Sequence, residues 1–437
     1  MSTFPDRVHK NLINVTRLLV GRSLVVVGAA VIAFATLTPN GGSPPPFNPL
    51  CVLCGESGAV DLVLNVLLFV PLGVGLALVE ARPARAIAGM FAASLVIELL
   101  QFFVIPGRDA TIRDVLMNSL GGGLGFAIGS YRNSLIRPSA SLGLKLLAGW
   151  TIVWLTLQTV AAYSLMPALT QSKYYGQIGR ELGEMLSAFP GEILKPTVDS
   201  VVIPDSVFPA DRVRRLLSRR QGALIQATVI PRGCPTTTAG IVRIADADLR
   251  EILLLAQNDA DLLFGVRTGA EMLRLRPMRY RLHHVFGPNS TCGYMGDTIL
   301  LQARYARTGV FLRAAARGTV TEETIAPNVS QGWRLFLPAQ TYIEPGSWSA
   351  TLTAMWLFIL MLPAGYWGFF IAPDTQVGKA RATATPAVFV LAILMIAFVG
   401  APALFGIPKV RPWEWMAALG GAVAGATMAM RARSRLR

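Results

Sequence analysis

Charged residues are scarce in this sequence. Of its 437 residues, only 15% are Asp, Glu, Lys or Arg, whereas 53% are hydrophobic and the mean hydropathy is +0.50. A soluble domain needs a polar surface, so this composition excludes a soluble cytosolic enzyme and indicates a membrane protein. The net charge of +15 does not indicate nucleic acid as a partner, because most of the excess cations lie beside apolar segments, where they set topology.

Histidine is also rare, and the common motifs of catalysis are missing. The sequence has three histidines, and its apolar segments contain no Ser/His/Asp set, Walker motif or zinc-binding helix motif. We therefore expect neither a metal nor a cofactor.

Eight apolar stretches are each long enough for one helical crossing, since roughly 20 residues span a hydrocarbon core about 30 Å thick. They lie at 23–39, 60–79, 86–105, 114–130, 142–165, 348–372, 385–404 and 413–430. The predicted fold class is an α-helical polytopic membrane protein of about eight transmembrane helices. No small-residue cleavage pattern follows the first stretch, so we interpret it as a retained anchor.

The distribution of Lys and Arg predicts the orientation. Segments assigned to the cytoplasm carry 15 of these residues, and the opposite short loops carry 4, of which Lys409 and Arg411 form a weak exception. The positive-inside rule then places both termini in the cytoplasm. The expected location is the inner (plasma) membrane of the cell. The predicted domains are a cytoplasmic N-terminus (1–22), a five-span membrane domain (23–165), an extracytoplasmic domain (168–347), a three-span region (348–430) and a basic cytoplasmic tail (431–437).

The four cysteines fall on the side predicted to be extracytoplasmic, where disulfide bonds form. The simplest pairing is Cys51 with Cys54 and Cys234 with Cys292, although four cysteines allow three connectivities. A redox role or half of a zinc site is an alternative for the Cys-x-x-Cys pair.

The sequence of the extracytoplasmic segment predicts mostly β-strands. After a short amphipathic helix around Tyr174 to Phe189, short β-favouring runs alternate with Gly, Pro, Asn and Asp. The predicted strands are Ala223–Ile230, Gly240–Ala245, Glu251–Ala256, Asp261–Arg267, Arg279–Phe286, Thr298–Tyr305, Val310–Ala315 and Trp333–Leu337. This pattern predicts an inserted all-β sandwich, and from Ala223 to Thr268 it resembles a concanavalin-like or laminin-G-like jelly roll.

The jelly-roll resemblance implies glycan binding, sometimes with calcium, although a fold does not by itself establish a function. Asp246, Asp248, Asp259 and Asp261 are conceivable calcium ligands. Their spacing is unlike that of an EF-hand, and acidic residues are common in turns, so we do not predict a metal site there.

Polar residues recur in three of the predicted spans. Asp61 and Asn65 open the second span, Asp114 and Asn118 open the fourth, and each pair lies on one helix face because its members are four residues apart. In the third span Glu98 and Gln101 also share a face, and Arg108 follows in the next loop. Since polar groups are costly in lipid, we predict that these seven residues converge in one polar pocket in the outer leaflet.

A purely structural interpretation is available for most of this set. Asp61 and Asp114 are also explained as helix caps, and the three amides as interhelical hydrogen-bonding groups. Glu98 is harder to explain in this way, because a carboxylate in the middle of a helix has no cap to satisfy. The glycines at 121, 122, 123 and 125 are typical of close helix packing and not of a phosphate loop.

At these residues the sequence resembles the VanZ-like family over about 24–130. The shared pieces are Asp61-x-x-x-Asn65, Leu68-Phe-Val-Pro-Leu-Gly73, Glu98-Leu-Leu-Gln101, Pro106-Gly-Arg108 and Asp114-x-x-x-Asn118 followed by Gly121. The family is named after a protein associated with teicoplanin resistance, and its biochemical activity is poorly defined. The resemblance implies an integral membrane protein of the cell envelope, with antibiotic resistance as a distant extrapolation.

The sequence is compatible with three alternative functions. The first is a cell-envelope protein whose pocket binds a lipid-linked glycan or a phospholipid head group, with Arg108 and Arg113 facing phosphate. The second is a membrane enzyme acting on such a lipid, with Glu98 as its catalytic general base. The third is a membrane-anchored protein that binds extracytoplasmic glycans through its β domain, for which eight spans are excessive.

Overall fold

The structure is a computed structural model that describes residues 4–39, 57–108, 110–182, 186–199, 201–288, 292–337, 342–343, 346–371 and 379–434. The chain divides into two compact units. The first comprises Met1–Gly143 with Ala429–Arg437, and the second comprises Leu144–Met428.

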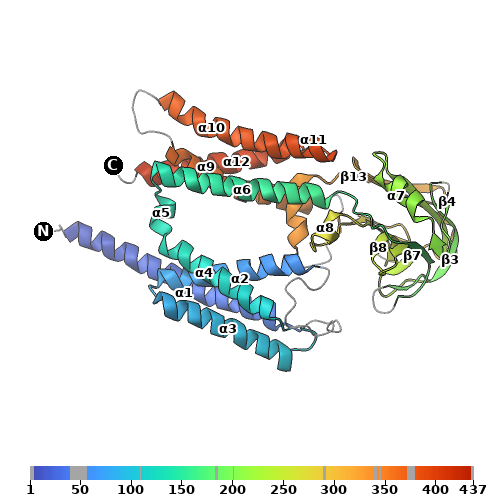
Figure 1. Ribbon diagram of the computed structural model, residues 1–437, viewed down its shortest axis with the longest axis horizontal. Helices are drawn as coiled ribbons and strands as arrows, with labels where there is room; N and C mark the ends of the chain where they lie inside the picture. Colours follow the sequence, from blue (N-terminus) through green and yellow to red (C-terminus); the bar gives the residue numbers. More distant parts are fainter. Residues whose placement is uncertain are drawn as a thin grey trace. The chain divides into compact units, whose positions relative to one another are not determined.

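The first unit is a helical bundle. Its described helices are α1 (Phe4–Leu37), α2 (Gly58–Leu78), α3 (Pro83–Phe103), α4 (Ile112–Ser130) and the short α5 (Arg132–Ile136) (Figure 1). Pro83 occupies the first position of α3, where the absence of an N–H has no cost. Thr111 caps α4, because its side-chain oxygen accepts the N–H of Asp114.

Helices α2 and α4 approach each other backbone to backbone. A Cβ atom on Gly121 would lie 2.0 Å from the carbonyl oxygen of Val66, and one on Gly125 would lie 2.1 Å from that of Val70. No side chain larger than hydrogen fits at either position. This contact is the close packing that the glycine-rich stretch of α4 predicts.

In the second unit, the helices are α6 (Ala140–Ser164), α9 (Ser347–Ile371), α10 (Lys379–Met395), the π-helical η3 (Ile396–Gly400), α11 (Ala401–Phe405) and α12 (Pro412–Ser434). The indole N–H of Trp150 donates to the carbonyl of Leu360 at 2.7 Å and so joins α6 to α9. Glycine again brings two helices together, since a Cβ on Gly421 of α12 would lie 2.2 Å from the carbonyl oxygen of Phe358 in α9.

Six helices among the described residues are long and apolar enough to cross a membrane, two fewer than the eight expected. They are Asn14–Leu37, Gly58–Leu78, Pro83–Phe103, Ala140–Ser164, Trp348–Ile371 and Ala387–Phe405. The expected spans at 114–130 and 413–430 are helical, as α4 and α12, but glycine, alanine and charged residues dilute their apolar character. The chain is therefore a multi-pass membrane protein whose apolar helix count is lower than the sequence indicates.

Between α6 and α9 the chain forms an inserted β domain. Its strands are β1 (Tyr174–Ile178), β2 (Ser187–Ala188), β3 (Gly191–Val198), β4 (Val201–Val202), β5 (Val207–Phe208), β6 (Ala223–Pro231), β7 (Ala239–Asp246), β8 (Glu251–Asn258), β9 (Asp261–Val266), β10 (Arg279–Leu282), β11 (Ile299–Ala306), β12 (Gly309–Ala316) and β13 (Thr319–Ile325). Within the described residues, one sheet has the order β10-β9-β8-β7-β1-β5, with β2 beside β7, and the other has the order β13-β12-β11-β6-β3-β4. Pairing is antiparallel except between β2 and β7.

Two burial patterns describe the packing of these sheets. Residues of β6 alternate between buried and half-buried, as expected for a strand with one face on the core. Strands β7 and β9 are buried on both faces. The second face is covered because Leu186 packs on Leu254 and Leu263, with Leu182 and Tyr342 beside them.

Most of the predicted strands are confirmed, and three expectations in this region are wrong. The described residues between Tyr174 and Phe189 do not form a helix and instead contain β1 and β2. Gly176 lies so close to the carbonyl oxygen of Pro204 that a Cβ atom would be 2.0 Å away, a contact that favours an extended strand. The segment 333–337 is not a strand and belongs to the 3₁₀ helix η1 (Val329–Phe336), capped by Asn328. The strand expected at 279–286 ends at Leu282.

The β-sandwich expectation agrees with the two sheets, whereas a concanavalin-like fold is not confirmed. Several elements have no counterpart in the sequence prediction: strands β3, β4 and β5, helix α7 (Ala210–Ser218) and strand β13. The one-turn helix α8 (Gly269–Met272) is also new, and Thr268 and Glu271 form its capping box.

The disulfide bond between Cys234 and Cys292 is confirmed. It joins the loop after β6 to the loop before β11, across 58 residues of chain. A cross-link over such a loop restricts the unfolded chain and stabilises the domain by about 2–4 kcal/mol. Cys51 and Cys54 lie outside the described residues.

Replacing Gly125 with Ala should separate α2 from α4, because the new methyl group would overlap the Val70 carbonyl. We expect a loss of roughly 1–3 kcal/mol, measured as a lower melting temperature of the detergent-purified protein. The control is Gly123→Ala on the same helix, where a Cβ atom meets nothing within 4 Å. Equal melting temperatures for the two variants would contradict the close contact.

Candidate functional site

The polar residues predicted to form a site lie at one end of the first bundle. Asp61 is in the first turn of α2, Asp114 is in the first turn of α4, and Glu98 is near the end of α3. Neither aspartate is the residue that caps its helix, because Ser57 and Thr111 occupy those positions. The acids are nonetheless favourably placed, since a helix N-terminus attracts negative charge.

Arg113 is the cation at the centre of this end of the bundle. Its Nε donates to Oδ1 of Asp114 at 2.9 Å, and its Nη2 lies 3.9 Å from Oδ2 of Asp61. The side chain is buried, so its charge depends on these carboxylates for compensation. From the sequence alone, we expect Arg113 to face the phosphate of a bound lipid and do not group it with the three acids. Its position directly before Asp114 was the available signal.

Glu98 points into the bundle and is only 6% exposed. Its Oε2 accepts the backbone N–H of Thr111 at 2.8 Å, so the carboxylate sits at the N-terminus of α4. The charges of Asp114 and Arg113 are close enough to act on it. Glu98, Asp61 and Asp114 are thus brought together around Arg113, and we call these four residues the acidic cluster.

The amides contribute hydrogen bonds between helices. Asn118 Nδ2 donates to the hydroxyl of Ser94 at 2.9 Å, and Gln101 Nε2 donates to the carbonyl of Thr36 at 2.9 Å. Both side chains are buried, yet the other amide atoms, Oδ1 of Asn118 and Oε1 of Gln101, have no partner within the described part of the chain. An acceptor left in this state is costly unless a donor reaches it. Asn65 is half-buried on α2, one turn below Asp61.

Arg108 lies apart from the acidic cluster, against the end of α1. Its Nε donates to the carbonyl of Thr38 at 3.0 Å, and its Nη2 donates to that of Ala35 at 2.8 Å. Carbonyls at a helix C-terminus lack partners within the helix, so a cation is stabilising there. Gln101 reaches the same segment of α1. Arg108 is therefore held at the end of α1, and Gln101, three residues after Glu98 on α3, joins that segment to the residues around the acidic cluster.

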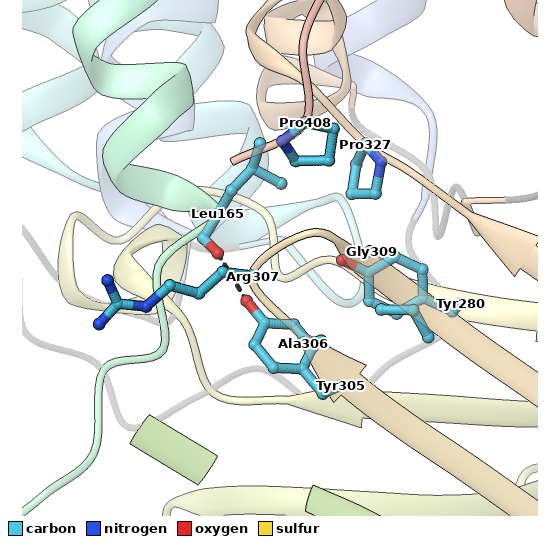
Figure 2. A pocket seen from close by; sticks show the side chains of 9 residues that line it. Leu165, Tyr280, Tyr305, Ala306, Arg307, Gly309, Pro327 and Pro408 are labelled. Atoms are coloured by element: carbon cyan, nitrogen blue, oxygen red, sulfur yellow. Dashed lines mark hydrogen bonds between the residues drawn. The ribbon is translucent and has the colours of Figure 1, made fainter. Parts of the chain in front are cut away.

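A second candidate is a small pocket in the second unit, which sequence reasoning did not anticipate (Figure 2). Its lining includes Leu165, Tyr280, Tyr305, Arg307 and Pro408. The hydroxyl of Tyr305 donates to the carbonyl of Leu165 at 2.5 Å, drawn as a dashed line in Figure 2. Burial raises the pKa of both tyrosines above the ordinary value of 10, so both phenols stay neutral and act as hydrogen-bonding groups.

The aspartates considered for calcium have structural partners. Asp246 Oδ1 accepts the backbone N–H groups of Asp248 and Arg250 and so closes the turn between β7 and β8. Asp261 accepts the N–H of His284 and lies 3.0 Å from Nδ1 of His283. Among the described residues, no group of three or more His, Cys, Asp or Glu is arranged to hold a metal ion.

Arg113→Gln should destabilise the protein because it leaves the largely buried carboxylate of Asp114 without its cation. We expect a loss of roughly 1–3 kcal/mol in detergent. Asp114→Asn and the double variant complete a thermodynamic cycle, in which the double variant loses less than the sum of the single variants. Strictly additive losses would mean that the two charges do not interact.

Comparison with known proteins shows a similarity within the first unit. No curated protein and no solved structure matches the chain. Residues 15–134, however, match the family model described as VanZ/LLP1. That range contains the acidic cluster, both buried amides and Arg108. Residues 15–134 are therefore similar to a VanZ/LLP1 domain, which we call the VanZ-like domain.

Proposed function

We propose that the VanZ-like domain binds the polar head group of an outer-leaflet amphiphile, a phospholipid or a lipid-linked glycan, at the acidic cluster. The observation that carries this proposal is the pair of buried amide oxygens without partners, Asn118 Oδ1 and Gln101 Oε1. They lie on α4 and α3 at the depth of Glu98, itself an acceptor. This end of the bundle is thus rich in buried acceptors and poor in donors.

A head group bearing hydroxyl or ammonium groups supplies the missing donors. Burying an acceptor without a donor costs about 1–3 kcal/mol, so each hydrogen bond to a ligand relieves an existing cost. The acidic cluster has more negative than positive charges, since its three carboxylates face the one guanidinium of Arg113. Binding a hydroxylated or cationic group is therefore favoured over binding a second anion.

The two arginines that sequence reasoning assigned to phosphate already have partners. Arg113 contacts Asp114 and Asp61, and Arg108 donates to two carbonyls of α1. We therefore place the donor groups of the amphiphile at the acidic cluster, with its phosphate outside. This arrangement suits a cell-envelope protein, the setting implied by the VanZ-like resemblance. A role in glycopeptide resistance rests on the family name alone.

One alternative uses the same site for catalysis. Glu98 holds the Thr111 N–H through one carboxylate oxygen, which leaves the other oxygen to take a proton from a bound head group as a general base. The protein would then be an enzyme acting on the lipid, with Glu98 as the catalytic residue.

Glu98→Leu removes the acceptor and should abolish lipid retention, measured by native mass spectrometry of the protein purified in mild detergent. Glu98→Gln keeps an acceptor oxygen and should bind about tenfold more weakly, because a hydrogen bond to a charged group contributes about 1.5–3 kcal/mol. The control is Glu80→Gln, which makes the same change just beyond the opposite end of α2, where Glu80 pairs with Arg17.

Equal lipid occupancy in wild type and Glu98→Leu would contradict the binding site. A lipid that Glu98→Gln retains unchanged, but that only the wild type converts to product, would favour the enzyme instead.

We also propose that the β domain is extracytoplasmic and that the membrane is the inner (plasma) membrane. Support comes from the distribution of Lys and Arg and from the disulfide bond, which forms in oxidising compartments. In intact cells treated with a reductant, a membrane-impermeant thiol reagent should label Cys234 and Cys292, as read by peptide mapping. The opposite orientation is indicated if the reagent labels both cysteines only after the membrane is permeabilised.

A further inference from the structure

One end of the β domain is attached directly to the end of a membrane span. The backbone N–H of Gly269 donates to the carbonyl of Met166 at 2.8 Å, and Tyr305 donates to that of Leu165. Helix α8 packs on the last turn of α6, since a Cβ atom on Gly269 would lie 2.3 Å from the carbonyl oxygen of Tyr163. Because α6 is long and apolar enough to cross a membrane, these contacts hold this end of the domain at the membrane surface.

Four of the turns at this end, residues 219–222, 247–250, 267–278 and 307–308, form what we call the basal rim. In an antiparallel sheet, every second turn lies at the same end of the domain, and the residue pairs between strands show which turns these are. Ala223 pairs with Tyr305, and Glu251 pairs with Ala245. Gly222 lies against the Tyr305 backbone, and Arg267 donates to the carbonyl of Ile252. The turns 232–238, 259–260, 283–288, 292–298 and 317–318 lie at the opposite end and are called the distal loops.

Charge is distributed unequally between the two ends. By sequence, the basal rim holds seven arginines, at 219, 220, 250, 267, 274, 276 and 307, against two acids, Asp248 and Glu271. The distal loops hold two arginines and two acids. Glu271 is half-buried in the capping box of α8, and Asp248 pairs with Arg250. The basal rim is thus strongly cationic, and its arginines at 219, 220, 250 and 274 are exposed.

The basal rim also carries exposed apolar side chains beside its arginines. Leu249, directly before Arg250, is 63% exposed and has a φ of 59°. Glycine or asparagine usually occupies a left-handed turn position, because other side chains strain the backbone there. An exposed leucine at such a position is unfavourable if the surface faces only water. Met272 is 55% exposed, and Leu273 beside it is also exposed, just before Arg274.

We propose that the basal rim docks on the membrane surface by binding anionic phospholipid head groups through its arginines, while Leu249, Met272 and Leu273 insert among the lipids. Charge complementarity and continuity with the end of α6 support this occupant. Cations beside apolar side chains are the pattern of interfacial membrane contacts, in which charge and apolar burial act together. Two further cations, Lys409 and Arg411, lie in the segment between α11 and α12 and are the exception to the positive-inside rule. The residue before Lys409 is Pro408, which lines the same pocket as Arg307 (Figure 2). The cations of Lys409 and Arg411 are explained by the same anionic surface.

The test is hydrogen–deuterium exchange of the full-length protein in two kinds of nanodisc, one of phosphatidylcholine and one of equal parts phosphatidylcholine and phosphatidylglycerol. An arginine near an anionic surface strengthens association roughly fivefold. We therefore expect amide exchange in 247–250 and 267–278 to slow by about fivefold or more in the anionic nanodisc, with no change in the distal loops. High salt should remove the difference.

Matched variants separate the basal rim from general charge effects. Arg219→Gln/Arg274→Gln should remove the protection, whereas Arg232→Gln/Arg317→Gln, an equal loss of charge from the distal loops, should preserve it. Glu98→Leu should also preserve it, so the result is independent of the site in the VanZ-like domain. Equal exchange in the two nanodiscs would overturn the proposal, and so would protection by glycerol phosphate in detergent alone, which would indicate a soluble anion as the ligand.

Discussion

Backbone contact between α2 and α4 is the constraint on which the VanZ-like domain depends. The carbonyls of Val66 and Val70 occupy the space where side chains at 121 and 125 would stand, so both positions must be glycine. Lipid provides no hydrophobic driving force between helices, and van der Waals contact at this short distance takes its place. Since α2 and α4 are held this closely, their first turns are adjacent. Asp61 and Asp114 therefore share one guanidinium, that of Arg113.

The rest of the site follows from this pairing. Helix α3 is antiparallel to α2 and α4, so its C-terminal end lies beside their first turns. Glu98 therefore reaches the N-terminus of α4 and accepts the Thr111 N–H. Positively polarised N–H groups and a buried arginine make a carboxylate tolerable at a depth where it is otherwise costly. The hydrogen bonds of Asn118 to Ser94 and of Gln101 to Thr36 join α3 to its neighbours. Each amide has one oxygen without a partner within the described residues, and we propose that a ligand donates hydrogen bonds to these oxygens.

Much of this arrangement could be predicted from the sequence because the relevant signals are local. Apolar runs predicted the helices, and short β-favouring runs between turn residues predicted strands such as β6 and β11. The four-residue spacing of Asp61 and Asn65 placed both on one helix face. Signals that depend on tertiary contacts were missed. Nothing local distinguishes a strand from a helix at Tyr174 until the backbone of Pro204 is seen beside Gly176. The separation of Arg108 from the acidic cluster likewise depends on where α1 ends. The hydropathy of α4 is low because the glycines that it needs for packing replace apolar side chains.

We propose that the acceptors around Glu98 hold the head group of an amphiphile. An electron cryomicroscopy map of the protein purified in nanodiscs of its native lipids is the sharpest test of this binding. We expect density for a head group within hydrogen-bonding distance of Glu98 and of the amide oxygen of Asn118 or Gln101. A map in which these oxygens accept hydrogen bonds from other side chains of the bundle, with no lipid among them, would exclude the proposed site.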